Sequence, residues 1–442
     1  MATSFAHVTF DAASQPLPPR RHAWAVFAVV FLLMVVDYVD RQVVVSMFPH
    51  LKAHWQLSDA ELGGLVSVIS ITVALGTVPL SLLADRWSRV KSIFLMALVW
   101  SGATIACAFA SRYSELLAAR SVVGVGEAAY GSAGAALLAT LFPARMRSTV
   151  LGAFLAAGLL GSVLGVVLGG VIAEHWGWQA GFGAVGIPGL LLALVFLLVV
   201  RDYKTVELPD SGARDVSPRK VGAIIAALMK PRTAIVTCIG AGLQLLVVST
   251  TYAWLPSYFN RYYGLAPDRA GMKTGLVVLV SGVAAVVWSI VADRLSGTHH
   301  RARLTVPAVC ALLTAALMCT AFAGLPPGSA QFAVLLAGAT TMTGSIGPVC
   351  AVVIDVVHPG LRATAAAVLS LTQNLIGLAA GPLLAGLLSD AYGLPFALSV
   401  MPLFCLFAAG FFTLAARTYV SDARRANATT PGVAGDLDPQ AA

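Results

Sequence analysis

The sequence predicts an all-α membrane protein in which twelve transmembrane helices form two pseudo-symmetric bundles of six. Three observations predict this fold class: an apolar composition, twelve separate apolar segments, and two short motifs that recur in the second half. Of the 442 residues, 58% are hydrophobic and 11% are charged, and the mean hydropathy is +0.85. A soluble domain is about 45–50% apolar and about 25% charged. The composition therefore excludes a soluble enzyme, a nucleic-acid binder and a disordered scaffold.

Twelve segments are long and apolar enough to be transmembrane helices, each of which needs about 20 predominantly apolar residues. They form two groups of six, separated by a polar interval from Arg201 to Lys220. We expect a cytoplasmic tail over 1–22, an N-terminal bundle over 23–200, a cytoplasmic linker over 201–232, a C-terminal bundle over 233–417 and a cytoplasmic tail over 418–442. The predicted spans are 23–46, 61–84, 92–111, 115–141, 149–173, 179–200, 233–258, 271–292, 304–324, 331–356, 364–388 and 395–416.

The distribution of basic residues predicts the orientation of the chain, because Lys and Arg concentrate in cytoplasmic loops. With the N-terminus inside, 21 of the 28 Lys and Arg residues fall on the cytoplasmic side. Five fall on the opposite side, at positions 52, 112, 261, 269 and 273. We therefore expect both termini in the cytoplasm. The formal net charge of +8 is explained by this topology and not by nucleic-acid binding.

Two motifs recur at equivalent places in the two halves. The sequence SLLADRWS at 81–88 returns as SIVADRLS at 289–296, an offset of 208 residues. The sequence RST at 147–149 returns as RAT at 362–364, an offset of 215 residues. Parallel repeats of six helices are one of the architectures of secondary transporters.

The segment at 81–89 resembles the loop signature of the major facilitator superfamily, although Ser81 and Ser88 stand where that pattern has glycine. The resemblance covers essentially the whole chain and implies the major facilitator fold. Shorter motifs are similar to the Spinster-like branch: DYVDR at 37–41, RSVVGVGEA at 120–128, WGW at 176–178, GIPG at 186–189 and WLPSY at 254–258. Animal members of that branch move sphingosine phosphate or lysophospholipids, so the resemblance implies a lipid-like substrate.

Charged residues in the recurring motifs predict a gate on the cytoplasmic face. Carboxylates and guanidinium groups at helix ends can latch two bundles together. In an alternative interpretation, the basic residues determine only the topology. The residues of the predicted gate are Asp85, Arg86, Arg89, Asp293, Arg294, Arg147 and Arg362.

Five ionisable residues lie inside two N-terminal spans: Asp37, Asp40 and Arg41 in the first, and Arg120 and Glu127 in the fourth. Such groups cost at least a few kcal/mol in the membrane interior and persist where they face a cavity or each other. Their spacing places Asp37 on one helix face with Asp40 and Arg41. The resemblance implies that both helices flank a central cavity. The cluster has a formal charge of −1, which one proton would neutralise.

We expect Glu127 and Asp40 to carry the proton, because the neighbours of Glu127 are glycines and alanines that stabilise a charge poorly. Arg41 is then the partner whose release couples protonation to movement, with Asp37 beside it. Arg120 is either a fixed counter-charge or a ligand for an anionic head group. The alternative is a static buried network that holds the two helices together.

The C-terminal spans are almost uncharged and carry hydroxyl and amide side chains instead. A charged wall that faces an apolar wall with scattered hydroxyls favours a solute with a polar head and an apolar tail. Individual hydroxyls in spans usually bond to their own helix, whereas an adjacent pair of amides is less easily explained by packing. The predicted substrate-binding residues are Arg120, Tyr130, Gln244, Thr251, Tyr252, Trp254, Thr341, Gln373 and Asn374.

The sequence contains no pattern typical of an enzyme or a metal site. The eight histidines lie in tails, loops or span ends, and the six cysteines lie in apolar runs without a paired spacing. A Walker A pattern is absent, which argues against an ATP-driven pump. We expect no enzymatic activity, no cofactor and no metal, and an ion or substrate gradient as the energy source.

Together these observations predict a secondary active transporter of the inner membrane that works by alternating access and is coupled to protons. The expected partners are an amphipathic lysolipid- or sphingolipid-like solute, protons and membrane lipid, with no nucleic acid and the chain acting as a monomer. Two alternatives stay open. One is a proton-coupled organic-anion or multidrug exporter of the same fold. The other is a non-transporting membrane receptor or lipid scrambler, in which the charges only stabilise packing.

Overall fold

The computed structural model describes residues 19–200, 231–357 and 361–428, and within these ranges the chain is helical throughout its regular structure. Among these described residues, twelve helical segments are long and apolar enough to cross a membrane. They coincide with the twelve predicted spans, and at most ends the bounds differ by only a few residues. The largest difference is ten residues, at the C-terminal end of the last span, Leu394–Ala426. Residues 201–230 of the predicted linker lie outside the described residues.

The N-terminal half supplies six spans and one short helix that the sequence did not predict, α2. Its helices are α1 (Arg20–Ser46), α2 (Phe48–Trp55), α3 (Asp59–Arg86), α4 (Arg89–Ala108), α5 (Tyr113–Glu127), α6 (Tyr130–Leu141), α7 (Ala144–Trp176) and α8 (Trp178–Val199). Here α5 and α6 are the two parts of one span that is broken at residues 128–129.

The C-terminal half contains more interrupted spans than the N-terminal half. Its elements are α10 (Arg232–Tyr263), α11 (Pro267–Ser296), α12 (Ala302–Cys319), η1 (Thr320–Gly324), α13 (Ser329–Met342), α14 (Ile346–Asp355), α15 (Arg362–Thr372), η3 (Gln373–Ala379), α16 (Ala380–Tyr392), α17 (Leu394–Val400), η4 (Met401–Leu403) and α18 (Phe404–Ala428). The last of these, α18, continues into the tail that was predicted from residue 418.

Local sequence explains where several helices begin and end. The Ser58 hydroxyl accepts a hydrogen bond from the Glu61 amide, and the Glu61 carboxylate accepts one from the Ser58 amide, so that α3 begins in a capping box. Gly177 and Gly393 end α7 and α16 with φ values of 81° and 87°, which a residue with a Cβ rarely adopts.

Glycines on one face of α7 allow its backbone to approach α1 closely. A Cβ at Gly165 would lie 2.7 Å from the carbonyl oxygen of Val39, and one at Gly169 would lie 2.7 Å from that of Val43. Small residues at a crossing permit this kind of backbone packing in membranes. The contact fixes the rotation of α1 and therefore the directions in which its charged residues face.

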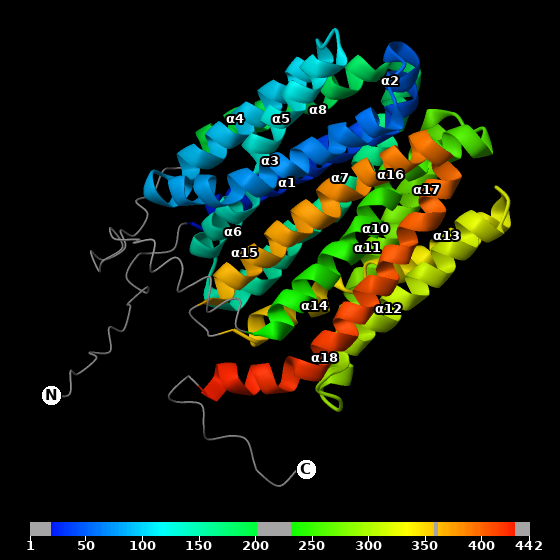
Figure 1. Ribbon diagram of the computed structural model, residues 1–442. Helices are drawn as coiled ribbons and strands as arrows, with labels where there is room; N and C mark the ends of the chain where they lie inside the picture. The colour runs from blue at the N-terminus through cyan, green and yellow to red at the C-terminus, as the bar shows by residue number, and fades with distance from the viewer. Residues whose placement is uncertain (1–18, 201–230, 358–360, 429–442) are drawn as a thin grey trace.

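The two halves lie side by side (Figure 1). The glycines whose backbones approach the opposite half most closely, Gly63, Gly170 and Gly386, lie toward one end of the molecule. We call this end the α2 face, because α2 lies there, and the end where α1 begins and α18 ends the terminal face. At the α2 face the rings of Phe48 and Trp254 are 5.4 Å apart. A Cβ at Gly271 would lie 2.7 Å from the carbonyl oxygen of Val166 in the opposite half. The halves are thus closely packed at the α2 face.

Replacing Gly165 by Leu is expected to destabilise the protein, because the added side chain would overlap α1. Overpacking of this kind costs about 1–3 kcal/mol, so the midpoint of thermal unfolding in detergent should fall by several degrees. Gly152→Leu is the matched control on the same helix, since a Cβ at Gly152 meets nothing within 4 Å. Equal midpoints for the two variants would contradict this role for the α1–α7 contact.

Candidate functional site

The structure brings the five predicted ionisable residues together between α1 and α5. Asp37, Asp40, Arg120 and Glu127 are buried, and Arg41 alone has an appreciably exposed side chain, at 21%. The charges divide into two groups of ion pairs. Since successive residues on an α-helix point about 100° apart, the neighbours Asp40 and Arg41 face different partners.

The first group consists of one guanidinium and two carboxylates. The Nη2 atom of Arg41 lies 3.0 Å from Oε2 of Glu127, and its Nε atom lies 3.5 Å from Oδ2 of Asp37. The same guanidinium lies 5.4 Å from the centre of the Tyr38 ring. This group carries the excess negative charge of the cluster, because one cation serves two acids.

The second group is a single ion pair sealed from solvent. The Nη1 atom of Arg120 lies 3.5 Å from Oδ1 of Asp40 and 3.3 Å from the Asp40 carbonyl oxygen. Both side chains are 0% exposed. Sequence reasoning placed Asp40 and Glu127 together around Arg41; the structure instead places Asp40 with Arg120 and Glu127 with Arg41.

Glu127 is the last residue of α5, at the break between α5 and α6. The hydroxyl of Thr77 donates a hydrogen bond of 2.9 Å to the carbonyl oxygen of Ala128, which the break leaves without an intrahelical partner. Irregular backbone within a membrane needs such partners. Neither carboxylate oxygen of Glu127 has a well-aligned hydrogen bond among the described residues. Its charge is therefore balanced mainly by the Arg41 guanidinium, which is its ion-pair partner.

Most of the predicted substrate-binding residues form contacts within the protein. Tyr130 donates to the carbonyl oxygen of Val30 at 2.7 Å, and Thr251 donates to that of Val247 at 2.8 Å in its own helix. The hydroxyl of Tyr252 bonds to Ser281, and that of Thr341 to Thr314 at 2.9 Å.

The three amides and the one indole of the same prediction differ in their surroundings. The Gln244 amide donates to the carbonyl oxygen of Met342 at 2.9 Å, where the span breaks between α13 and α14. The Trp254 indole donates to the carbonyl oxygen of Pro382 at 3.0 Å. Gln373 and Asn374, by contrast, are partly exposed, and the Asn374 amide bonds only within its own span, to Ser370. Together with Tyr252, they are the members of the predicted set that are partly exposed.

At the terminal face, two residues of the predicted gate, Asp293 and Arg147, contact their own halves. Asp293 lies 3.1 Å from Arg303, which also pairs with Asp355 at 2.7 Å. The Nε atom of Arg147 donates to the carbonyl oxygen of Phe142 at 3.3 Å. Arg294 and Arg362 are exposed, and Arg89 is partly exposed. The side chains of Asp85 and Arg86 lie outside the described residues.

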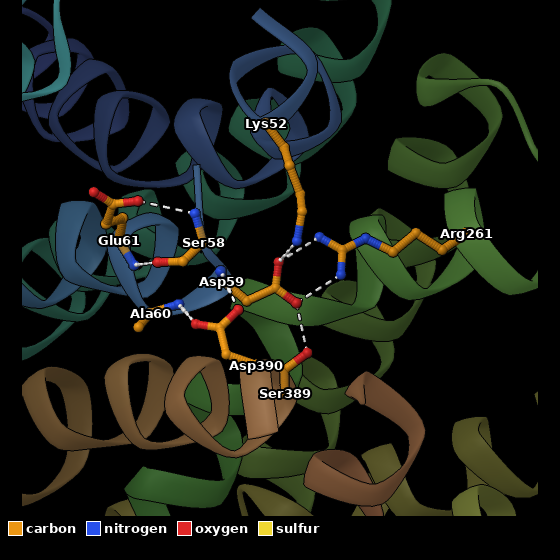
Figure 2. A network of polar contacts seen from close by, with 8 residues as sticks. All are labelled: Lys52, Ser58, Asp59, Ala60, Glu61, Arg261, Ser389 and Asp390. Atoms are coloured by element: carbon orange, nitrogen blue, oxygen red, sulfur yellow. Dashed lines mark hydrogen bonds and ion pairs between the residues drawn. The ribbon is translucent and has the colours of Figure 1, made fainter. Parts of the chain in front are cut away.

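An ion pair and several hydrogen bonds join the halves at the opposite end, the α2 face, where sequence reasoning placed no gate. Asp59, the first residue of α3, is 2% exposed and lies 2.5 Å from Lys52. Both Nη atoms of Arg261 in the C-terminal half donate to the Asp59 carboxylate at 2.7 Å, and the Ser389 hydroxyl donates to it at 2.5 Å (Figure 2).

A second carboxylate completes this group from the C-terminal half. The Asp390 carboxylate accepts hydrogen bonds from the backbone amides of Asp59 and Ala60 at 2.7 and 2.8 Å (Figure 2). We call Lys52, Asp59, Arg261, Ser389 and Asp390 the Asp59 latch. One signal in the sequence pointed to it: Lys52 and Arg261 are two of only five basic residues assigned to that face.

Asp59→Asn is expected to favour separation of the halves at the α2 face. The substitution leaves the charges of Lys52 and Arg261 without their shared partner. We expect the substitution to destabilise the closed state by about 1–3 kcal/mol. This is less than the cost of breaking a fully buried ion pair, because the Lys52 and Arg261 side chains are 39% and 23% exposed. Spin labels on cysteines introduced at positions 174 and 330, in a background without native cysteines, should report a longer distance between the halves.

The matched control for the latch is Glu115→Gln, which removes an ion pair of 3.0 Å with Arg112 at the same face but within one half. It should leave the distance distribution as in the parent protein. If Asp59→Asn also left the distribution unchanged, the Asp59 latch would not hold the halves together.

Comparison with known proteins agrees with this architecture. The family profile of the Major Facilitator Superfamily matches residues 30–378. Protein spinster homolog 1 of Xenopus tropicalis is 26% identical, over 93% of this chain and 84% of the relative. The sphingosine-1-phosphate transporter SPNS2 of Danio rerio is 25% identical, over 88% and 83% of the two chains.

A solved structure has the same fold. It is the crystal structure of a bacterial homolog of the human lysosomal transporter Spinster in an inward-facing, unoccupied conformation, and it superimposes with a TM-score of 0.82 at 21% identity. The match covers 92% of this chain and 99% of that one. The chain therefore belongs to the Major Facilitator Superfamily, and within that family it resembles the Spinster transporters.

Proposed function

We propose that this protein is a proton-coupled secondary transporter that works by alternating access. The observation that carries the proposal is the position of Arg41, 3.0 Å from Glu127 and 3.5 Å from Asp37 inside a bundle of membrane spans. One cation between two acids leaves an excess negative charge where charge is costly. Binding of one proton removes that excess, so this group is suited to take up and release a proton.

Movement of Arg41 is the step that would couple the proton to the conformation. A proton on Glu127 removes the attraction that holds the guanidinium, and Arg41 can then move because its side chain is partly exposed. Asp40 stays in the proposed coupling group in a different role from that of Glu127. Its charge holds Arg120 at 3.5 Å and keeps a neutral pair beside the titrating group.

The proposed solute is amphipathic, with an anionic or polar head and an apolar tail, as in lysolipids and sphingolipids. Three features support this class. Arg41 offers a partly exposed cation, whereas Arg120 is fully buried in this conformation. Gln373 and Asn374 offer partly exposed amides on the other half. The relative SPNS2 is named for transport of a phosphorylated sphingoid base.

We further propose that the protein resides in the inner membrane of a bacterium and acts as a monomer, with its terminal face in the cytoplasm. The excess of Lys and Arg in the loops of that face supports the orientation.

Proteoliposomes under an imposed pH gradient test this proposal. We expect flux of radiolabelled sphingosine-1-phosphate or lysophosphatidic acid to rise with the gradient, and Glu127→Gln to remove the response to it, because the variant cannot bind the proton. Glu115→Gln, an exposed carboxylate on the same helix, is the matched control and should respond like the parent protein.

Three other outcomes would contradict the proposal. Flux that ignores both the gradient and Glu127→Gln identifies a lipid scrambler, and no flux of any probe identifies a receptor. Gradient-driven flux of benzoate alone, with none of the lipids, identifies an organic-anion transporter and overturns the assignment of the solute.

A further inference from the structure

The side chain of Tyr38 lies beside the charged cluster without forming an ion pair. On α1 it precedes Arg41 by three residues, so the two side chains share one face of the helix. The guanidinium carbon of Arg41 lies 5.4 Å from the centre of the Tyr38 ring. A cation within about 6 Å of an aromatic ring is attracted by the negative charge density of the ring face. Tyr38 is therefore a third partner for Arg41, in addition to Glu127 and Asp37.

The position of the Tyr38 ring is fixed by its packing on α7. A Cβ at Gly158 would lie 3.0, 3.1 and 3.3 Å from the Cζ, Cε2 and Cε1 atoms of Tyr38, and one at Gly161 would lie 2.7 Å from the Tyr38 Cβ. Nearly equal distances to three ring atoms place Gly158 above the plane of the ring and not at its edge. Two glycines of α7 thus leave the room that the ring occupies, and the contact restricts how far the ring can turn away from Arg41.

The three partners of Arg41 differ in the helix that carries them. Asp37 and Tyr38 lie on α1, as Arg41 itself does, whereas Glu127 lies on α5. A proton on Glu127 would therefore weaken the one partner of the three that joins α1 to another helix. With Glu127 neutral, the guanidinium keeps the Asp37 carboxylate and the Tyr38 ring. Arg41 then remains a compensated charge on α1, as the membrane interior requires.

The ring stabilises Arg41 more strongly when Glu127 is neutral. While Glu127 is ionised, its carboxylate lies 3.0 Å from the guanidinium, so the ring faces two opposite charges whose combined field is weaker than that of a cation alone. The separation of 5.4 Å is also close to the limit of the interaction. A guanidinium released by Glu127 can move nearer to the ring. Both effects favour the state in which Glu127 carries the proton.

The other charged and titratable side chains around the cluster belong to α1, α4, α5 and α6. Besides Asp37 and Arg41, they are Asp40, Cys107, Arg120 and Tyr130. The helices packed on α1 and α5 add no charged residue at this depth, since none occurs in α3 over 62–84, α4 over 92–108, α6 over 130–141, α7 over 149–173, α8 over 178–199, α10 over 233–260 or α11 over 274–292. The charge balance at Arg41 is therefore set by the five ionisable residues of α1 and α5.

We propose that Tyr38 is a positioning residue that holds the Arg41 guanidinium on α1 while Glu127 is protonated, and that it thereby raises the affinity of Glu127 for the proton. The ring allows the ion pair between α1 and α5 to break without leaving Arg41 to Asp37 alone. The proposal rests on the proposed function, because it takes Glu127 as the proton carrier.

An infrared titration of the protein in lipid tests this role. The carboxylic-acid band of Glu127 is identified by its loss in Glu127→Gln, and its intensity is followed against pH. Tyr38→Leu removes the ring and should lower the pH midpoint of the band by about half to one unit. Tyr38→Phe keeps the ring and should keep the midpoint of the parent protein. Phe31→Leu removes a ring elsewhere on α1 and is the matched control, which should leave the midpoint unchanged.

Pentafluorophenylalanine at position 38 provides the test if Tyr38→Leu does not fold. Its ring has nearly the shape of phenylalanine, but the fluorine atoms reverse the charge of the ring face, so the midpoint should fall as in Tyr38→Leu. An unmoved or raised midpoint in these two variants would overturn the role of Tyr38, as would an equal fall in Tyr38→Phe, which assigns the effect to the hydroxyl. A carboxylic-acid band that persists in Glu127→Gln would instead contradict the proposed function, and this inference with it.

Discussion

A charge inside a membrane must be paired within the protein, and this constraint organises the N-terminal half. Arg41 satisfies it for Glu127 and Asp37, and Arg120 satisfies it for Asp40. These pairs join α1 to α5, and the glycines of α7 allow the close approach that fixes the rotation of α1. The excess negative charge then resides at Arg41, the one member of the cluster with appreciable exposure, so the site best suited to exchange a proton is also the most accessible.

The distribution of contacts between the halves explains how a change at this site can affect the whole molecule. At the α2 face the Asp59 latch and the Ser67–Ala379 hydrogen bond cross from one half to the other. At the terminal face, Asp293 pairs with Arg303 in its own half. Opening of the α2 face therefore requires specific polar contacts to break together, and each of them has one partner in α3. Movement of α3 is thus the expected link between the two faces.

The sequence predicted the features that depend on neighbouring residues and missed those that depend on contacts between distant parts of the chain. The twelve spans follow from runs of apolar residues, and the charged cluster stands out because ionisable residues within spans are rare. The partner of Asp40 was not predictable, since it depends on the rotation of α1 against α5. The Asp59 latch joins residues 59 and 261, which no local pattern relates. The short helix α2 lay in a segment between two predicted spans that was read as a loop.

The role of Glu127 as the proton carrier is tested most directly by infrared difference spectra of the protein in lipid, recorded between neutral and acidic pH. A protonated carboxylic acid absorbs separately from a carboxylate. We expect acidification to produce a carboxylic-acid band that disappears in Glu127→Gln and persists in Glu115→Gln. A band unaffected by Glu127→Gln would show that another group takes the proton and would contradict the coupling role of the Arg41 cluster.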